Sequence, residues 1–184
     1  MKAKIIQNTL QVCCMNPTAG SFYVNPRLQR NYWTCSVPEP KRDSLSIIYS
    51  TILDGHFKDF KQGIKDQKNN IIKGALQLHQ SMQKKFKKTA INFHYEFNVR
   101  HLAGLFAGIL LSTPKNFTDV EKIPKLWLHE CQRIYGDRLV SRAHLDIFRE
   151  ICSEATKATF KGGVNMNAYL QAKNAKPLVF CNFS

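Results

Sequence analysis

The sequence lacks any apolar run long enough to cross a membrane, and its N-terminus lacks the features of a secretory leader. The first 14 residues, MKAKIIQNTLQVCC, contain neither a long apolar core nor a small-residue cleavage site. A transmembrane helix needs about 20 consecutive apolar residues, and the chain has no such run. We therefore expect no signal peptide, no membrane span and no membrane partner.

The spacings typical of metal sites and hydrolytic sites are also missing. The six cysteines form no CxxC pair, and the six histidines form no HxxxH pair. No serine, histidine and aspartate are arranged as a catalytic triad would require. Most of the cysteines stand among apolar residues, which is typical of free thiols in a reducing compartment. We expect no metal site.

Two motifs for nucleotide hydrolysis are absent as well. The chain contains no GxxxxGKS/T sequence, the glycine-rich loop that surrounds phosphates with backbone N–H groups. It also contains no aliphatic run that ends in Asp-Glu and could hold magnesium. We therefore expect that this chain alone neither holds Mg-ATP nor hydrolyses it.

Acidic residues are scarce: 13 acidic side chains face 27 lysines and arginines, for a net charge of +14. Such an excess favours an acidic partner or nucleic acid, although lysines also simply keep a surface hydrated. The lysine stretch QKKFKK (83–88) supports an alternative function as a basic helical module that binds nucleic acid. No nucleic-acid-reading motif accompanies it. An adaptor that docks unpaired strands on a partner is a third possibility.

What is present predicts a mixed α/β chain. Segments 10–15 and 32–37 are short apolar or aromatic runs closed by proline-containing turns, and 177–181 is similar, so we predict three strands. Helical spacing of apolar residues predicts helices over 45–53, 71–86, 99–110, 118–135 and 141–160. The polar stretch 58–70 is predicted to be a loop or a frayed turn. Small residues beside the stripe of 99–110, Gly104 and Gly108 among them, would let another element approach closely.

Four polar residues could contact phosphate. Asn16 ends the first predicted strand, where its amide could hold a water or touch a phosphate oxygen. Arg27 and Arg30 lie on the loop before the second strand, and guanidinium groups there suit charge stabilisation in phosphoryl transfer. Arg100 falls in the first turn of a helix, whose N-terminus also favours anions. Taken singly, each also has an ordinary explanation as a turn or surface residue.

Several long motifs in order resemble a known family. CMNPTAGSFYVNPRLQR, TAINFHYEFNVRHLAGLFAGILLSTP, LWLHECQRIYGDRLV and KPLVFCNFS are separated by helix-length gaps. Together they resemble the third AAA+ module of an axonemal dynein heavy chain, and the resemblance covers essentially the full length. It begins partway through the module, after the strands that would carry the nucleotide loop and the magnesium-binding acid.

The resemblance implies an incomplete AAA+ large-subdomain sheet of two to three strands in 1–40, a helical lid in 41–160, and a linker and strand in 161–184. It also implies a piece of an ATP-driven, minus-end-directed microtubule motor of the ciliary axoneme and cytoskeleton. Neighbouring AAA+ modules of the same heavy chain, microtubules, and dynein light and intermediate chains are the implied partners. ATP with magnesium is expected only in the complete module or ring.

The family also implies roles for the four polar residues. Asn16 matches the first sensor, which positions the attacking water near the γ-phosphate. Arg27, with Arg30 as the alternative, matches the arginine finger that points at the nucleotide of the preceding module. Arg100 matches the second sensor on the lid.

This chain departs from the family pattern at two places. The family usually has a histidine and a phenylalanine after the second arginine of the loop, where this chain has Asn31 and Tyr32. It usually has an aspartate after the lid arginine, where this chain has His101. An aspartate there would orient the arginine by a salt bridge, so this departure bears on the second-sensor role of Arg100. Binding or gating by this module is as well supported as turnover.

Overall fold

The structure is a computed structural model, and it describes residues 7–16 and 23–160. Its contacts divide the chain between Glu39 and Pro40 into two units. The predicted linker and strand of 161–184 lie outside the described residues. The two units are taken in turn, beginning with the larger one, which contains the predicted lid.

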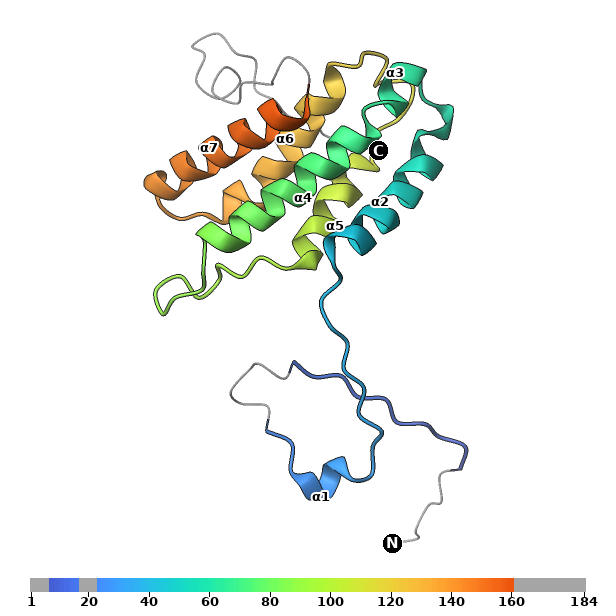
Figure 1. Cartoon of the computed structure of the whole chain (residues 1–184), viewed down its shortest axis with the longest axis vertical. Coiled ribbons are helices and arrows are strands. Elements are labelled where there is room, and N and C mark those ends of the chain that lie inside the picture. Colours follow the sequence, from blue (N-terminus) through green and yellow to red (C-terminus); the bar gives the residue numbers. More distant parts are fainter. Residues whose placement is uncertain (1–6, 17–22, 161–184) are drawn as a thin grey trace, which may run out of the picture. The chain divides into compact units, whose positions relative to one another are not determined.

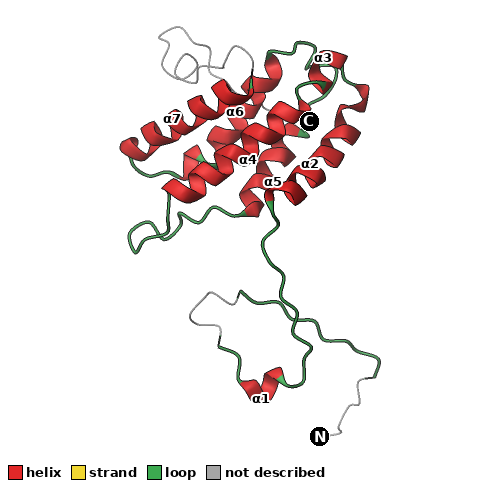
Figure 2. Cartoon of the chain, viewed as in Figure 1, coloured by secondary structure: helices red, strands yellow, loops and turns green. Residues whose placement is uncertain are grey.

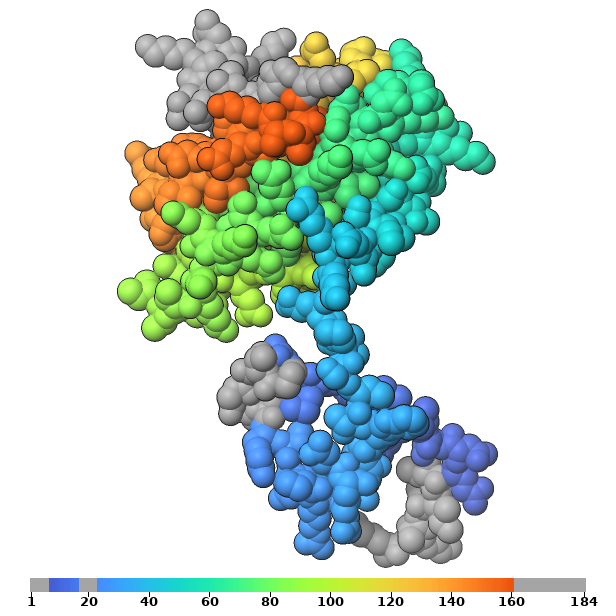
Figure 3. Space-filling model, in the orientation of Figure 1, coloured from blue at the N-terminus to red at the C-terminus, as the bar shows by residue number. Residues whose placement is uncertain are grey.

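The larger unit is a bundle of helices (Figure 1). The longer helices are α2 (Arg42–His56), α4 (Lys68–Lys85), α5 (Val99–Ile109), α6 (Lys122–Ile134) and α7 (Arg142–Thr159), with a short α3 (Gln62–Lys65) and 3-10 turns η1 (Phe57–Asp59) and η2 (Gly136–Arg138). Helix α4 packs against both α2 and α7, and α5 packs against α6. Figure 3 shows the α4 and α7 side chains meeting along one face of the bundle.

A continuous apolar core holds these helices together. Its largest fully buried side chains include Trp127 of α6, Tyr135 at the C-cap of α6, Phe106 of α5 and Phe148 of α7. Full burial of one such side chain contributes about 1.5–3 kcal/mol to folding. Tyr49 of α2 stacks on Phe106 with ring centroids 3.9 Å apart, which fixes α2 against α5. The bundle therefore has enough core to hold the start of α5 in a defined place.

Helical periodicity predicted these elements well, with one correction. Each of the five predicted helices is present, and Ser141 caps α7 by accepting a hydrogen bond from the His144 backbone N–H (3.1 Å). The segment 58–70 is predicted to be a loop or a frayed turn, and the structure has more helix there than this prediction allows. It contains α3 and the first turn of α4, and Ile64 is fully buried. Two buried apolar residues, Phe60 and Ile64, in a polar stretch give too weak a periodic signal to reveal a one-turn helix.

The smaller unit has a different structure from the one predicted. No strand is present in the described residues, including 10–15 and 32–37, which are extended coil (Figure 2). The side chains of Val12 and Trp33 are 84% and 94% exposed. A strand exists only when a neighbour completes its hydrogen-bond ladder, and neither segment has such a neighbour here. The predicted sheet of two to three strands is therefore not found in the part of the chain that the structure describes.

One helical turn in the smaller unit was not predicted. Helix α1 (Pro26–Gln29) begins after Asn25, whose side-chain oxygen accepts a hydrogen bond from the Arg27 backbone N–H (2.9 Å). Asparagine at the cap followed by proline at the first helical position is a common way to start a helix. The sequence signal was present but was interpreted as a loop.

Candidate functional site

Arg100 lies in the first turn of α5, where the local sequence fixes the backbone. Asn98 is the N-cap, and its side-chain oxygen accepts a hydrogen bond from the Arg100 backbone N–H (3.1 Å). The neighbouring Leu102 is fully buried and anchors the turn in the core, whereas Arg100 itself is exposed. The arginine is thus presented at the positive end of a helix dipole, which favours contact with an anion.

His101 closes the same turn from the other side. Its ring Nδ1 accepts a hydrogen bond from the Asn98 backbone N–H (3.1 Å), which completes a reciprocal capping box. A capping box usually uses glutamate or glutamine at this position. Here a histidine does the same with a ring nitrogen, so its protonation state decides whether the box can form.

Arg138, at the end of η2, contacts the opposite edge of the His101 ring. Its Nη1 lies against His101 Nε2, and its Nη2 donates to the His94 carbonyl oxygen (3.4 Å). The His94 ring in turn donates from Nε2 to the Arg138 carbonyl oxygen (3.2 Å). Arg138 therefore links the α6–α7 connection to the segment before α5 and to the start of α5 itself.

The electrostatics of this cluster favour a neutral His101. Burial and the nearby Arg138 guanidinium lower the pKa of His101, and Arg100 lowers it further. The hydrogen bond with the Asn98 backbone and the Glu96 carboxylate raise the pKa, and Glu96 is the weakest of these influences. A neutral ring at physiological pH keeps a lone pair available for a hydrogen bond.

His101, which stands where the family usually has an aspartate, is hydrogen-bonded to residues other than Arg100. The hydrogen-bond contacts of the His101 ring go to Asn98 and Arg138, and Arg100 influences the ring through its charge. Sequence analysis did not identify Asn98 or Arg138 as relevant to the site. The sequence does indicate the capping role of Asn98, since asparagine directly before an apolar-periodic helix is a common cap. It does not indicate the role of Arg138, because Arg138 is 37 residues from His101, whose ring it contacts.

The opposite side of α5 is fixed by close packing against α6, as its small residues predicted. A side chain at Gly104 would stand 3.1 Å from Ile134 Cδ1, and one at Gly108 would overlap the Glu130 carboxylate. Glu130 is buried and accepts from Arg133 Nη2 (2.6 Å) and Nε (3.0 Å). The lid arginine is therefore carried by a helix whose rear face allows little movement.

The remaining three predicted site residues belong to the smaller unit. Arg27 lies within α1, and Arg30 is its C-cap; both are exposed. Asn16 ends the described segment 7–16 and is also exposed. The Tyr32 hydroxyl donates to Gln11 Oε1 (3.0 Å) and so joins the two parts of this unit. Convergence of these three residues with Arg100 on nucleotide phosphates stays a prediction, because they and Arg100 belong to different units.

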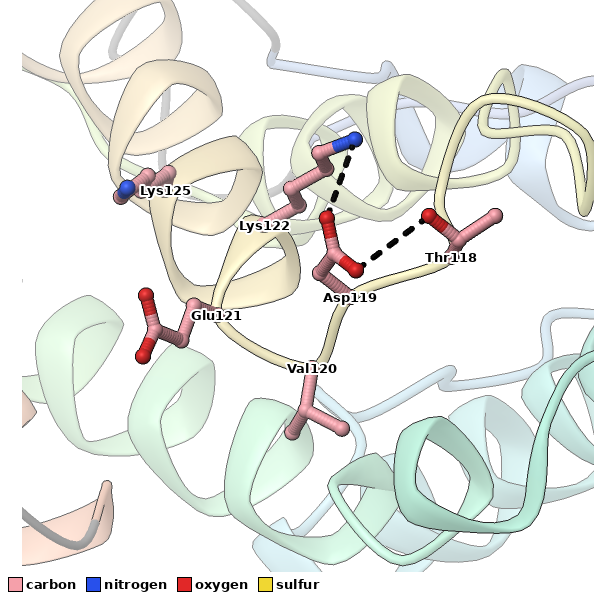
Figure 4. A pocket seen from close by; sticks show the side chains of 6 residues that line it. All are labelled: Thr118, Asp119, Val120, Glu121, Lys122 and Lys125. Carbon is pink, nitrogen blue, oxygen red and sulfur yellow. Dashed lines mark hydrogen bonds and ion pairs between the residues drawn. The ribbon is translucent and has the colours of Figure 1, made fainter.

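A shallow pocket lies elsewhere, where the loop after α5 enters α6 (Figure 4). Asp119 accepts from the Thr118 hydroxyl (3.3 Å) and pairs with Lys122 (3.3 Å), so the charges along its edge are partly neutralised. None of the four predicted site residues lines this pocket. The described residues also contain no cluster of histidine, cysteine or acidic side chains that could hold a metal.

None of the helices in the described residues combines the length and the apolar character needed to cross a bilayer. The two buried thiols, Cys131 and Cys152, lie in the bundle core, where burial raises their pKa values well above the usual range. Buried thiols of this kind serve as small apolar side chains rather than as nucleophiles.

The helical bundle and the capped arginine at the start of α5 define a class of domain. Residues 71–167 match the sequence profile of the AAA+ lid domain, and because the match covers more than half of the chain, this protein belongs to that family. Within it, the chain is a homologue of axonemal dynein heavy chains.

Three relatives illustrate this similarity. The chain is 50% identical over 181 residues to the dynein alpha chain of the flagellar outer arm of Chlamydomonas reinhardtii. It is 37% identical over 183 residues to the ciliary dynein beta chain of Tripneustes gratilla and to dynein axonemal heavy chain 17 of Mus musculus. Each match covers 98% of this chain but only 4% of the relative. The chain therefore corresponds to a small part of such a heavy chain.

Proposed function

We propose that this chain is the lid and adjoining large-subdomain segment of one AAA+ module in an axonemal dynein heavy chain, and that it supplies groups that contact nucleotide. The observation that carries the proposal is Arg100, exposed at a capped helix N-terminus within a lid-family bundle. The similarity to an axonemal heavy chain over 98% of this chain supports the motor context.

In this proposal, Arg100 contacts the phosphates of the module's own nucleotide. Asn16 positions the attacking water, and Arg27, with Arg30 as the alternative, reaches the nucleotide of the neighbouring module. Phosphoryl transfer depends on preorganised cations and dipoles rather than on covalent chemistry. Because these groups are divided between a lid and a neighbour, hydrolysis would depend on the geometry between modules, as coupling of ATP to movement requires.

The segments 10–15 and 32–37 are proposed to become strands in the complete module. Their apolar side chains are exposed, including Leu10 at 89% and Val37 at 91%. Pairing with the upstream strands of the large subdomain would bury these side chains and complete the backbone hydrogen bonds. The α/β character of residues 1–40 therefore belongs to the proposal for the whole module.

The wider context follows from the relatives. We propose that the parent protein is a minus-end-directed microtubule motor of the ciliary axoneme. Its partners would be the neighbouring AAA+ modules of the same chain, microtubules, and dynein light and intermediate chains. Mg-ATP would bind only where the rest of the module supplies a phosphate loop, and the module would act by binding, by gating or by turnover.

The roles can be separated in a polypeptide that contains the complete module and its neighbour. We expect Arg27→Gln to slow ATP turnover at the neighbouring site by roughly 100-fold or more, since arginine fingers contribute that much in related enzymes, and to leave nucleotide affinity at the module's own site unchanged. Arg30→Gln is the matched variant that distinguishes the two finger candidates. Unchanged turnover in both variants and in the double variant would rule out the finger role.

A further inference from the structure

At the start of α5, two hydrogen-bond donors compete for the ring of His101, and the outcome affects how the turn that carries Arg100 is held. Two hydrogen-bond donors point at the ring of His101, one at each nitrogen. The Asn98 backbone N–H points at Nδ1 from 3.1 Å, and the Arg138 guanidinium lies at Nε2. A neutral imidazole has one N–H and one in-plane lone pair, so it can accept from only one donor at a time.

The ring therefore has two arrangements. With its proton on Nε2, it accepts from Asn98 and closes the capping box of α5, and Arg138 loses its acceptor on the ring. With its proton on Nδ1, it accepts from Arg138, and the Asn98 N–H loses its partner. The Arg100 N–H is held by the Asn98 side chain in both cases, but the reciprocal bond that stiffens the turn exists only in the first.

We propose that Arg138 is a positioning residue for Arg100, and that it acts by competing with the cap of α5 for the single lone pair of His101. The inference rests on the proposed function only in assigning a nucleotide contact to Arg100. The competition itself is a property of the described residues. Without Arg138 the capping box would stay closed and fix the turn that carries Arg100, whereas a hydrogen bond from Arg138 to the ring would open the box and loosen the turn.

The charged groups around the ring set the range in which this competition operates. Arg138 lies at its Nε2 edge, Arg100 is one residue before it, Glu96 lies in the preceding segment, and His79 interacts with it from α4. Burial and the two cations together outweigh the Asn98 hydrogen bond and Glu96, so the pKa of His101 is lowered and the ring stays neutral at physiological pH. An aspartate carboxylate at position 101 has enough lone pairs to accept from the Asn98 N–H and from Arg138 at the same time.

The tautomer of His101 can be observed directly by 15N NMR of the imidazole ring in the full chain. In Arg138→Met, which removes the competing donor, we expect the Nε2–H tautomer to dominate and the Asn98 amide to exchange about threefold more slowly or better. Arg138→Lys should stay close to wild type, because it keeps a cationic donor. Arg149→Met, which removes an arginine paired with Asp146 on α7 (2.8 Å), is the matched control and should change neither signal.

The direction of the exchange effect separates this proposal from a purely structural role. If Arg138 only braced the fold, its loss would speed exchange at Asn98, and that result would overturn the proposal. Should Arg138→Met fail to fold, His101→Asp decides the matter. It should slow Asn98 exchange while Arg138 stays bound, and faster or unchanged exchange would refute the competition.

A second measurement connects the competition to nucleotide. In the complete module, Arg138→Met should tighten Mg-ATP binding by about twofold or more, because the turn carrying Arg100 is preorganised. A simple loss of positive charge predicts weaker binding instead. If Arg100→Met weakens binding but Arg138→Met leaves it unchanged or weaker, the proposed function stands and the positioning role falls. If Arg100→Met has no effect, the proposed function falls, even where the tautomer shift is observed.

Discussion

At the scale of single residues, burial lowers the pKa values of three histidines in the lid, His56, His79 and His101. His79 is 4% exposed, and its Nδ1 shares a hydrogen bond with the Tyr135 hydroxyl (2.9 Å). Burial, with a smaller effect from His101, lowers the pKa of His79 to about 4. Burial also lowers the pKa values of His56 and His101. These rings stay neutral where exposed histidines begin to charge.

This predicts a loss of stability in mild acid. Between about pH 6.5 and pH 4 the unfolded chain binds a proton at His79 that the folded chain does not, so the free energy of unfolding falls as pH falls through that window. Urea titrations at several pH values measure the slope. In His79→Gln, which can still bond Tyr135 but does not titrate, the slope should be shallower. Part of it should remain because of His56 and His101, and equal slopes in the two proteins would contradict the account.

Sequence reasoning at this scale reached the candidate arginine but not its support. Arg100 could be selected because it stands beside a clear apolar stripe in the first turn of a helix. The contact between Arg138 and His101 could not be predicted from the sequence. The two residues are 37 positions apart, and their contact depends on how α5 and α6 pack. Side-chain contacts between distant elements are set by tertiary packing, which local patterns do not encode.

At the scale of elements, helices were predictable and strands were not. An α-helix forms its backbone hydrogen bonds within one segment, so the spacing of Leu102, Phe106 and Ile109 is enough to indicate α5. A strand depends on a neighbour, and the apolar runs at 10–15 and 32–37 have none in the described structure. The composition of these segments shows that they carry apolar side chains that a strand could bury. Whether they form strands depends on a neighbouring strand with which to pair.

The contact between α5 and α6 gives a test at this scale. Alanine at Gly108 would overlap the buried Glu130 carboxylate, which is paired with Arg133, so we expect a loss of about 2–3 kcal/mol in the free energy of unfolding. Gly55 of α2 is the control, since a side chain there meets nothing within 4 Å. Its alanine variant should be more stable by about 0.5–1 kcal/mol because alanine favours a helix.

Urea denaturation of the two variants measures these changes. If α5 packs closely against α6, the free energy of unfolding should fall in Gly108→Ala and rise in Gly55→Ala. A Gly108→Ala protein as stable as wild type would show that α6 can move away from α5, and the rigid support inferred for Arg100 would then be wrong.

At the scale of the whole molecule, the two units have very different surfaces. The helical unit buries a continuous core, whereas the smaller unit exposes large apolar side chains such as Trp33 and Val37 at more than 90%. Exposed apolar segments of this kind favour association with a partner or aggregation. This difference agrees with the proposal that residues 1–40 are completed by the rest of an AAA+ module.

The central claim is that this chain contributes phosphate-contacting groups to a nucleotide site that it does not form alone. The most direct test is the affinity of the complete module for Mg-ATP, measured by calorimetry for wild type and for Arg100→Gln, with Arg149→Gln as the charge-matched control. The account predicts that Arg100→Gln weakens binding by about tenfold or more, as loss of a charged hydrogen bond would, while Arg149→Gln binds as wild type does. Equal affinity in all three proteins would contradict it.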